Sequence, residues 1–312
     1  MSKNKFLFLI IIIINFLNVD NLSANKIEIL YKVENYPITN KDISKEINYL
    51  IMLNDKLKKV SEKDLIQYAT KSIIKEKVKK NEILKNLNFR KNDEVVENQL
   101  KILKNNLNLG DEEFKNLISK LDITENYLKE KIEVEILWNK LIYGIYKDKV
   151  IIDTLSISNK LKKDLEDPSN FMEEYLLHEI LYAPSKTTDI ENNKSKIDKS
   201  IKEIGFENTA NIYSESDSSK FGGKIGWVKE NQLTKEILIN IKNLKIGEHT
   251  NSIRVPGGML ILFLKDKRTS KLELSFEEEL EKIINSERNR QLDQYSSIYY
   301  KKAEINTKIY EN

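Results

Sequence analysis

The sequence contains no cysteine and only two histidines among its 312 residues. Without cysteine there can be no disulfide bridge, thiol nucleophile or cysteine-ligated metal, and two histidines are too few for a histidine metal cluster. Proline and glycine are also scarce, with four and nine residues. We therefore expect no metal site built on cysteine or histidine, and a stretch in which glycines gather is informative.

Neither sign of charge dominates the chain. Lys and Arg number 52 and Asp and Glu 49, which leaves a formal net charge of +3, and the two signs are interspersed. This pattern predicts no nucleic-acid partner. An apolar fraction of 40% beside 32% charged residues is typical of a globular protein with room for two domains. Lys and Asn are so abundant that no single one of them is given weight.

The long apolar run of this chain lies at its N-terminus. Two lysines precede apolar residues 6–14, which give way to the small residues Ser23 and Ala24. This order predicts a secretory signal peptide over residues 1–24, cleaved near Ala24. The alternative is a membrane anchor, but the run is shorter than the ~20 residues that a span needs. We expect an exported protein with no stable membrane insertion after cleavage.

Residues 39–165 are predicted to be almost entirely helical. Thr39 with Asp42 and Ser61 with Asp64 have the spacing of a capping box, and each pair precedes apolar residues at helical period. Further helices are predicted over residues 93–106, after Gly110 and from about Thr124. Because the connections are short, we expect one helical N-terminal domain over residues 25–168.

The pattern changes after residues 167–168, where we expect a domain boundary. Residues 173–182 are predicted to form a strand, and Pro-Gly-Gly at residues 256–258 separates two apolar runs, which is typical of a β-hairpin. Helices are predicted between them, ending near residues 203 and 213 and spanning residues 232–244. These elements predict a small α+β domain over residues 169–270.

From Ser275 the helical pattern returns. The alternative to a packed helix is a solvated tail, but apolar residues such as Leu280, Ile283 and Tyr299 favour packing. We expect residues 271–312 to form a C-terminal helix that packs on the N-terminal domain. The predicted fold class is therefore α+β: a helical N-terminal domain, completed by a C-terminal helix, with a smaller α+β domain inserted between them.

The stretch YSESDSSKFGGKIGW, residues 213–227, holds three of the nine glycines. With HEILY before it and LKIGEH and GGMLILFLKDKR after it, in that order and at those distances, it resembles a parvulin-type peptidyl-prolyl isomerase domain. Together with its helical flanks, the chain resembles the SurA-type periplasmic chaperones. In that family the helical domain carries chaperone activity, and outer-membrane β-barrel precursors are clients. The resemblance covers one parvulin domain in this chain.

The resemblance implies a peptide groove that lowers the barrier to rotation about a Xaa-Pro bond, without a nucleophile or cofactor. The family pattern has two histidines on neighbouring strands and a Cys or Asp in the loop. Carried over, the first histidine and the loop position give the catalytic candidates His178, Ser216 and Asp217. A buried histidine bonded to backbone is the alternative for His178. The apolar substrate-binding candidates are Ile225, Leu233, Ile237, Met259 and Leu260.

Three positions depart from the family pattern. Leu260 stands where the second histidine is expected, Ile237 where an aromatic residue is expected, and Thr234 where a glutamine-like residue is expected. The first two changes should impair catalysis more than binding, so we favour a periplasmic chaperone that binds unfolded exported and outer-membrane proteins. An active prolyl isomerase and an adaptor with an inactive parvulin fold remain the alternatives.

Overall fold

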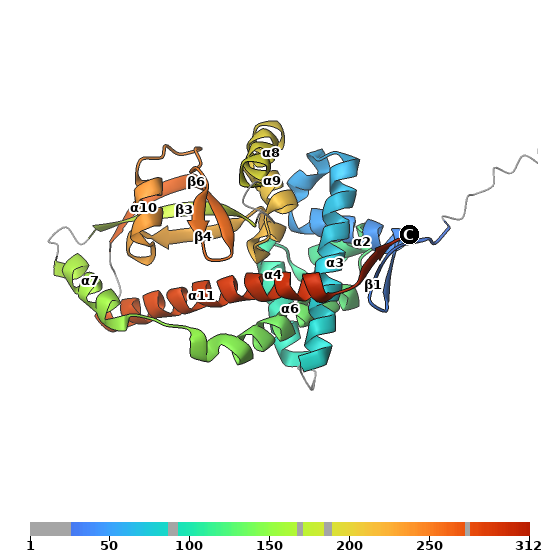
Figure 1. Cartoon of the computed structure of the whole chain (residues 1–312), viewed down its shortest axis with the longest axis horizontal. Coiled ribbons are helices and arrows are strands. Elements are labelled where there is room, and N and C mark those ends of the chain that lie inside the picture. Colours follow the sequence, from blue (N-terminus) through green and yellow to red (C-terminus); the bar gives the residue numbers. More distant parts are fainter. Residues whose placement is uncertain (1–25, 87–92, 167–170, 184–188, 272–274) are drawn as a thin grey trace, which may run out of the picture.

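The computed structural model describes residues 26–86, 93–166, 171–183, 189–271 and 275–312. The predicted signal peptide and the boundary at residues 167–168 lie outside these ranges. Figure 1 shows a helical part on the right, a sheet unit at the upper left, and one long helix, α11 (Phe276–Asn306), that runs along both.

The helical part begins with a hairpin of β1 (Ile29–Val33) and β2 (Tyr36–Thr39). The predicted capping box is complete at Thr39, where the backbone amide of Thr39 donates to Asp42 at 2.8 Å and that of Asp42 to the Thr39 hydroxyl at 3.2 Å. At the second pair, the backbone amide of Asp64 donates to the Ser61 hydroxyl at 3.2 Å. The bounds are α2 (Asn40–Leu53), η1 (Asp55–Lys59), α3 (Glu62–Asn86), α4 (Asp93–Asn106), α5 (Asp111–Lys120), α6 (Glu125–Tyr146), η2 (Lys147–Lys149) and α7 (Thr154–Glu166).

The sheet unit is a four-stranded antiparallel sheet in the order β4-β3-β6-β5. Its two central strands, β3 (Phe171–Tyr182) and β6 (Gly258–Lys271), carry apolar side chains on both faces. One face packs on α10 (Lys235–Lys242) and the other on α8 (Asp189–Ile204) and α9 (Phe206–Tyr213). The remaining elements are η3 (Asp217–Phe221), β4 (Lys224–Lys229), η4 (Glu230–Gln232) and β5 (Ile253–Val255).

The long helix α11 returns the chain to the helical part. Tyr299 and Tyr300 pack on the buried Trp138 of α6, with ring centroids 5.6 and 6.4 Å away, and the Trp138 indole donates to the Ser296 hydroxyl at 2.8 Å. After α11, β7 (Ile309–Glu311) pairs with β1, so the two ends of the described chain share one sheet. The predicted fold class, with a C-terminal helix packed on the helical domain, is confirmed.

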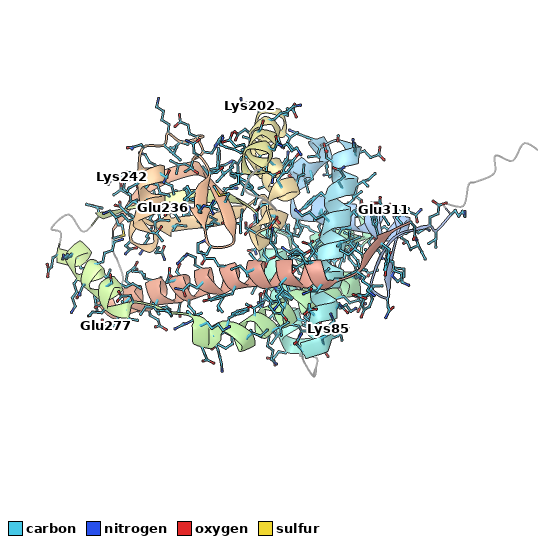
Figure 2. The ribbon with its side chains drawn as sticks, in the orientation of Figure 1. Lys85, Lys202, Glu236, Lys242, Glu277 and Glu311 are labelled. Atoms are coloured by element: carbon cyan, nitrogen blue, oxygen red, sulfur yellow. The ribbon has the colours of Figure 1, made fainter. Side chains whose placement is uncertain are left out.

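Charged side chains surround this fold. Figure 2 shows Lys202, Glu236, Lys242 and Lys85 pointing outward from three different helices. Within the described ranges, no helix is both long enough and apolar enough to cross a membrane.

Candidate functional site

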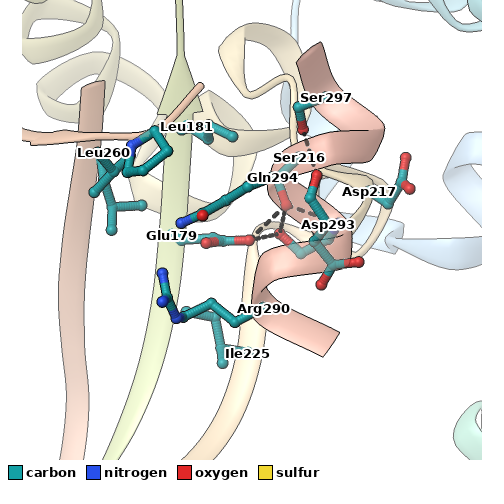
Figure 3. Close-up of a pocket in the computed structure, with 13 residues that line it drawn as sticks. Glu179, Leu181, Ser216, Asp217, Ile225, Leu260, Arg290, Asp293, Gln294 and Ser297 are labelled. Carbon is teal, nitrogen blue, oxygen red and sulfur yellow. Dashed lines mark hydrogen bonds between the residues drawn. The ribbon is translucent and has the colours of Figure 1, made fainter. Parts of the chain in front are cut away.

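A cavity of about 310 Å³ lies between the sheet and α11 (Figure 3). Five apolar residues line it from the strands and the β5–β6 turn: Leu181, Ile225, Val255, Pro256 and Leu260. The polar lining comes from β3 and the loop around η3, namely Glu179, Ser216, Asp217 and Ser218, and from α11, namely Arg290, Asp293, Gln294 and Ser297. The cavity is therefore built by the sheet unit and the C-terminal helix together.

Glu179 is the side chain that β3 turns toward the loop. One of its carboxylate oxygens accepts a hydrogen bond from Ser216 at 2.5 Å and another from Ser218 at 2.9 Å (Figure 3). Burial raises the pKa of Glu179 above its ordinary value, while the two hydroxyl donors act against the rise. The loop candidate Ser216 thus meets Glu179.

His178 lies on the opposite face of β3, which differs from the position expected from the sequence. Successive side chains of a strand point to opposite faces, and His178 pairs with Phe263 whereas Glu179 pairs with Leu262. The His178 ring stands edge-on to Phe263, and its Nδ1 donates to the Gly222 carbonyl at 3.1 Å. Burial lowers the pKa of His178. This environment is that of the alternative reading, a buried histidine bonded to backbone.

The glycine pair explains how the loop reaches β3. Gly223 has φ +75°, and a Cβ on it would lie 2.1 Å from the Glu179 carbonyl oxygen. The Glu179 amide donates to the Gly223 carbonyl at 2.7 Å, so the loop backbone lies directly against the strand. Only glycine permits this conformation and this approach, which places Ser216 and Ser218 beside Glu179.

Asp217, the other loop candidate, turns away from Glu179 toward the helical part. It forms ion pairs with Lys75 at 3.0 Å and Lys79 at 3.3 Å, while Glu135 of α6 pairs with Lys79 at 2.6 Å and with Lys220 at 2.7 Å. We call these five residues the anchoring cluster. Burial would raise the pKa of Asp217, but Lys75 and Lys79 hold it far below its ordinary value. The cluster fixes the loop to α3 and α6.

The five apolar candidates are not gathered into one groove. Ile225 and Leu260 line the cavity. Leu233 and Ile237 pack against Leu260 within the apolar cluster between the sheet and α10. Met259 packs on the other face of the sheet, beside α8 and α9, because it neighbours Leu260 along the strand and therefore points the opposite way.

Sequence analysis missed Glu179, Leu181 and the whole contribution of α11. Figure 3 shows Gln294 and Arg290 extending from α11 toward the strand that carries Glu179. A signal for Glu179 exists, because it is a charged residue inside the apolar run of a central strand. The α11 residues carry no comparable local signal, since they reach the cavity only through the packing of α11, which is distant from β3 in the sequence.

The arrangement suits peptide binding. An apolar wall can hold an aliphatic or prolyl side chain, and the Glu179 carboxylate and Gln294 amide can bond to a peptide backbone. Within the described chain, the residues that line the cavity include no histidine, and those on the two central strands are Glu179, Leu181 and Leu260.

Residues 179–266 match the family of PPIC-type PPIase (rotamase) domains. The curated chaperone SurA of Pseudomonas putida is 24% identical over 168 residues, which cover 50% of this chain and 38% of that protein. SurA of Alkalilimnicola ehrlichii is 26% identical over 174 residues, 53% of this chain and 39% of that protein. The matched segments thus span less than half the length of these relatives.

Solved structures give similar matches. A structure of PrsA, a peptidylprolyl isomerase from Bacillus anthracis, covers 75% of this chain and 94% of its own at 21% identity, with a TM-score of 0.31. One of two SurA-like chaperones from Campylobacter jejuni covers 91% of this chain and 98% of its own at 15% identity, with a TM-score of 0.35. The family and chaperone matches confirm the resemblance that the sequence predicts.

Proposed function

We infer that this chain is an exported periplasmic chaperone that binds unfolded polypeptides, outer-membrane β-barrel precursors among them. Its rotamase-type unit serves mainly as a peptide-binding module with weak prolyl isomerase activity. The proposed domains are residues 25–168, helical; 169–270, rotamase-type; and 271–312, the C-terminal helix on the first domain. The signal peptide, residues 1–24, is removed on export.

The observation that carries this proposal is the lining that the matched rotamase segment gives the cavity. The family pattern has histidines on neighbouring strands, whereas β3 and β6 turn Glu179, Leu181 and Leu260 to the cavity. Leu260 offers no hydrogen bond to a twisting amide, and Glu179 accepts from two serines. The apolar wall remains, so binding is retained better than catalysis.

Exposed apolar surface beside α11 supports the chaperone function. Ile151 and Leu155 are 81% and 71% exposed at the start of α7, and the backbone of Ile151 is held by the Gln291 side chain through bonds of 3.0 and 2.7 Å. Exposed apolar side chains on a fixed backbone can hold unfolded chains without ordering a loop first.

An active prolyl isomerase is the second candidate, favoured by the rotamase match and by the apolar wall of the cavity. Two assays on the same preparation separate the candidates. The first is suppression of light scattering by a heat-unfolded test protein, and the second is cis-trans exchange of an Ala-Leu-Pro-Phe peptide. We expect strong suppression and slow exchange. Fast exchange without suppression would make the chain an isomerase, and the absence of both would leave an adaptor.

The variant Ile151→Ser with Leu155→Ser tests the surface. It should reduce suppression of aggregation severalfold without changing the circular dichroism spectrum. The matched control is Ile305→Ser, which removes an equally exposed isoleucine, 83% exposed, near the far end of α11. Equal losses in both variants would contradict a holding role for the start of α7.

A further inference from the structure

Two carboxylic side chains that line the cavity beside α11 have no ion-pair partner among the described residues. Four charged side chains line it: Glu179, Asp217, Arg290 and Asp293. Whether they leave a net charge for a ligand depends on the partners that each already has. Two of the four side chains are neutralised by ion pairs within the chain, and the other two are not.

Asp217 and Arg290 are neutralised within the chain. Asp217 forms ion pairs with Lys75 and Lys79 at 3.0 and 3.3 Å. The Arg290 guanidinium donates two hydrogen bonds to Glu287, one turn earlier on α11, at 2.8 and 2.6 Å. A bidentate ion pair of this kind neutralises most of the charge of both groups. Neither residue therefore offers an unmatched charge to the cavity.

Glu179 and Asp293 have no ion-pair partner among the described residues. The hydrogen bonds to the Glu179 carboxylate come from the neutral hydroxyls of Ser216 and Ser218. No hydrogen bond or ion pair joins the Asp293 carboxylate to another described residue, although Asp293 lines the cavity. Partial burial and the charges of Asp217 and Glu179 raise the pKa of Asp293 to about 7. A cationic ligand would offset both the cost of burying this charge and the repulsion from Asp217 and Glu179.

The two carboxylates line the cavity from different elements. Glu179 comes from β3 next to Leu181 and Leu260, and Asp293 comes from α11 on the opposite side. An extended peptide turns successive side chains to opposite sides. A segment that places an apolar side chain on the wall of Leu181 and Leu260 would therefore turn the neighbouring side chain toward Asp293.

We propose that this cavity selects client segments in which a lysine or arginine is adjacent to an aliphatic or prolyl residue. The apolar side chain packs on the sheet wall, and the cation pairs with Asp293 and Glu179. This inference deepens the proposed function and rests on it, since it names the client segments that the rotamase-type unit takes. It makes Asp293, a residue of the C-terminal helix, a determinant of specificity for the sheet unit.

The experiment measures binding of dye-labelled pentapeptides to the full chain. The probes are Ala-Lys-Leu-Pro-Ala and two analogues in which uncharged norleucine or glutamate replaces lysine. We expect the lysine peptide to bind about fivefold more tightly than the norleucine peptide, the ratio for one partly exposed ion pair, and the glutamate peptide to bind most weakly. Equal affinities of the three peptides would overturn the inference, and no variant is needed for that comparison.

Three variants locate the effect. Asp293→Asn, which keeps the side-chain shape, should bring the lysine peptide close to the affinity of the norleucine peptide. The control Glu281→Gln removes an exposed carboxylate from the same helix outside the cavity and should leave the fivefold ratio unchanged. Gln294→Trp should fill the cavity and abolish binding of all three peptides. A lysine preference that survives both Asp293→Asn and Gln294→Trp would overturn the inference.

Failure of this specificity can be distinguished from failure of the proposed function. A chain that suppresses aggregation but shows no lysine preference keeps its chaperone role and loses this specificity. A chain that binds the lysine peptide as expected but does not suppress aggregation keeps the site and loses the chaperone role.

Discussion

The first prediction concerns the anchoring cluster, which contains more positive than negative charges. Lys75, Lys79 and Lys220 face Glu135 and Asp217, which gives three positive charges against two negative ones. Removing a carboxylate and removing a lysine should therefore have different costs. We compare Glu135→Gln with Lys79→Met, both of which preserve side-chain length.

The structure sets the size of each effect. Glu135→Gln leaves three lysines facing only Asp217, and the Lys79 side chain is 1% exposed, so we expect a loss of ~3–5 kcal/mol in the free energy of unfolding. Lys79→Met leaves two lysines and two carboxylates, with Asp217 still paired to Lys75 and Glu135 to Lys220. Because that set is balanced and Met suits a buried position, the expected loss is only ~1–2 kcal/mol.

Urea denaturation of the full chain, followed by circular dichroism, measures both losses. The control is Glu130→Gln, which removes an exposed carboxylate from the same helix and should change stability by less than ~0.5 kcal/mol. If Lys79→Met cost as much as Glu135→Gln, charge balance would not govern the cluster. If neither variant differed from the control, the loop would not depend on this contact.

Three further predictions concern other parts of the chain. Burial would raise the pKa of Glu76, but Lys131 and Lys77 lower it to about 2 from 4.5. The stability that this group contributes is therefore present above pH ~4.5 and lost as the pH falls toward 2, so the acid-induced loss in the free energy of unfolding should be smaller by ~2–3 kcal/mol in Glu76→Gln. Gly223→Ala should lower the free energy of unfolding by at least ~2 kcal/mol more than Gly247→Ala, because both glycines have positive φ but only at Gly223 would a Cβ lie 2.1 Å from a backbone atom. Similar decreases in melting temperature would refute the close approach. Mass spectrometry of the exported protein should find a chain that starts near residue 25, and a mature chain retaining Met1 would contradict the signal peptide.

The helical part was predictable because its signals are local. Capping boxes at Thr39 and Ser61 and apolar residues at helical spacing involve residues within one or two turns. The α10 helix came out shorter than predicted, Lys235–Lys242 within residues 232–244, because residues 230–232 form η4 instead. Helix ends depend on a few weak bonds, which a periodic pattern does not resolve.

The catalytic candidate on β3 shows the limit of what the strand's sequence pattern can predict. In EEYLLHEILY apolar residues occupy both faces, because β3 is a central strand covered on both sides. A strand of this kind has no polar face from which its register can be read. The resemblance therefore assigned His178, whereas the cavity receives Glu179, one residue further on. A shift of one residue exchanges the two faces of a strand.

Long-range contacts account for the remaining differences. Lys79 and Lys220 are two of many lysines, and nothing in their local sequence separates them from the exposed ones. Their roles follow from α6 and the loop meeting in space, which places Glu135 between them. The same holds for Asp293, which reaches the cavity only because α11 packs along both parts of the molecule.

The central claim is that a rotamase-type cavity, which β3 and β6 line with Glu179, Leu181 and Leu260 and with no histidine, binds peptides but isomerises them poorly. The direct test is the rate of prolyl exchange for the wild-type chain beside the variant Glu179→His with Leu260→His, after both are shown to be folded. A well-placed donor to a transition state is worth ~3–4 kcal/mol, or about 10²–10³ in rate, so we predict a slow wild-type rate and a gain between about tenfold and that limit in the variant. A fast wild-type rate that the double substitution leaves unchanged or lowers would contradict the account.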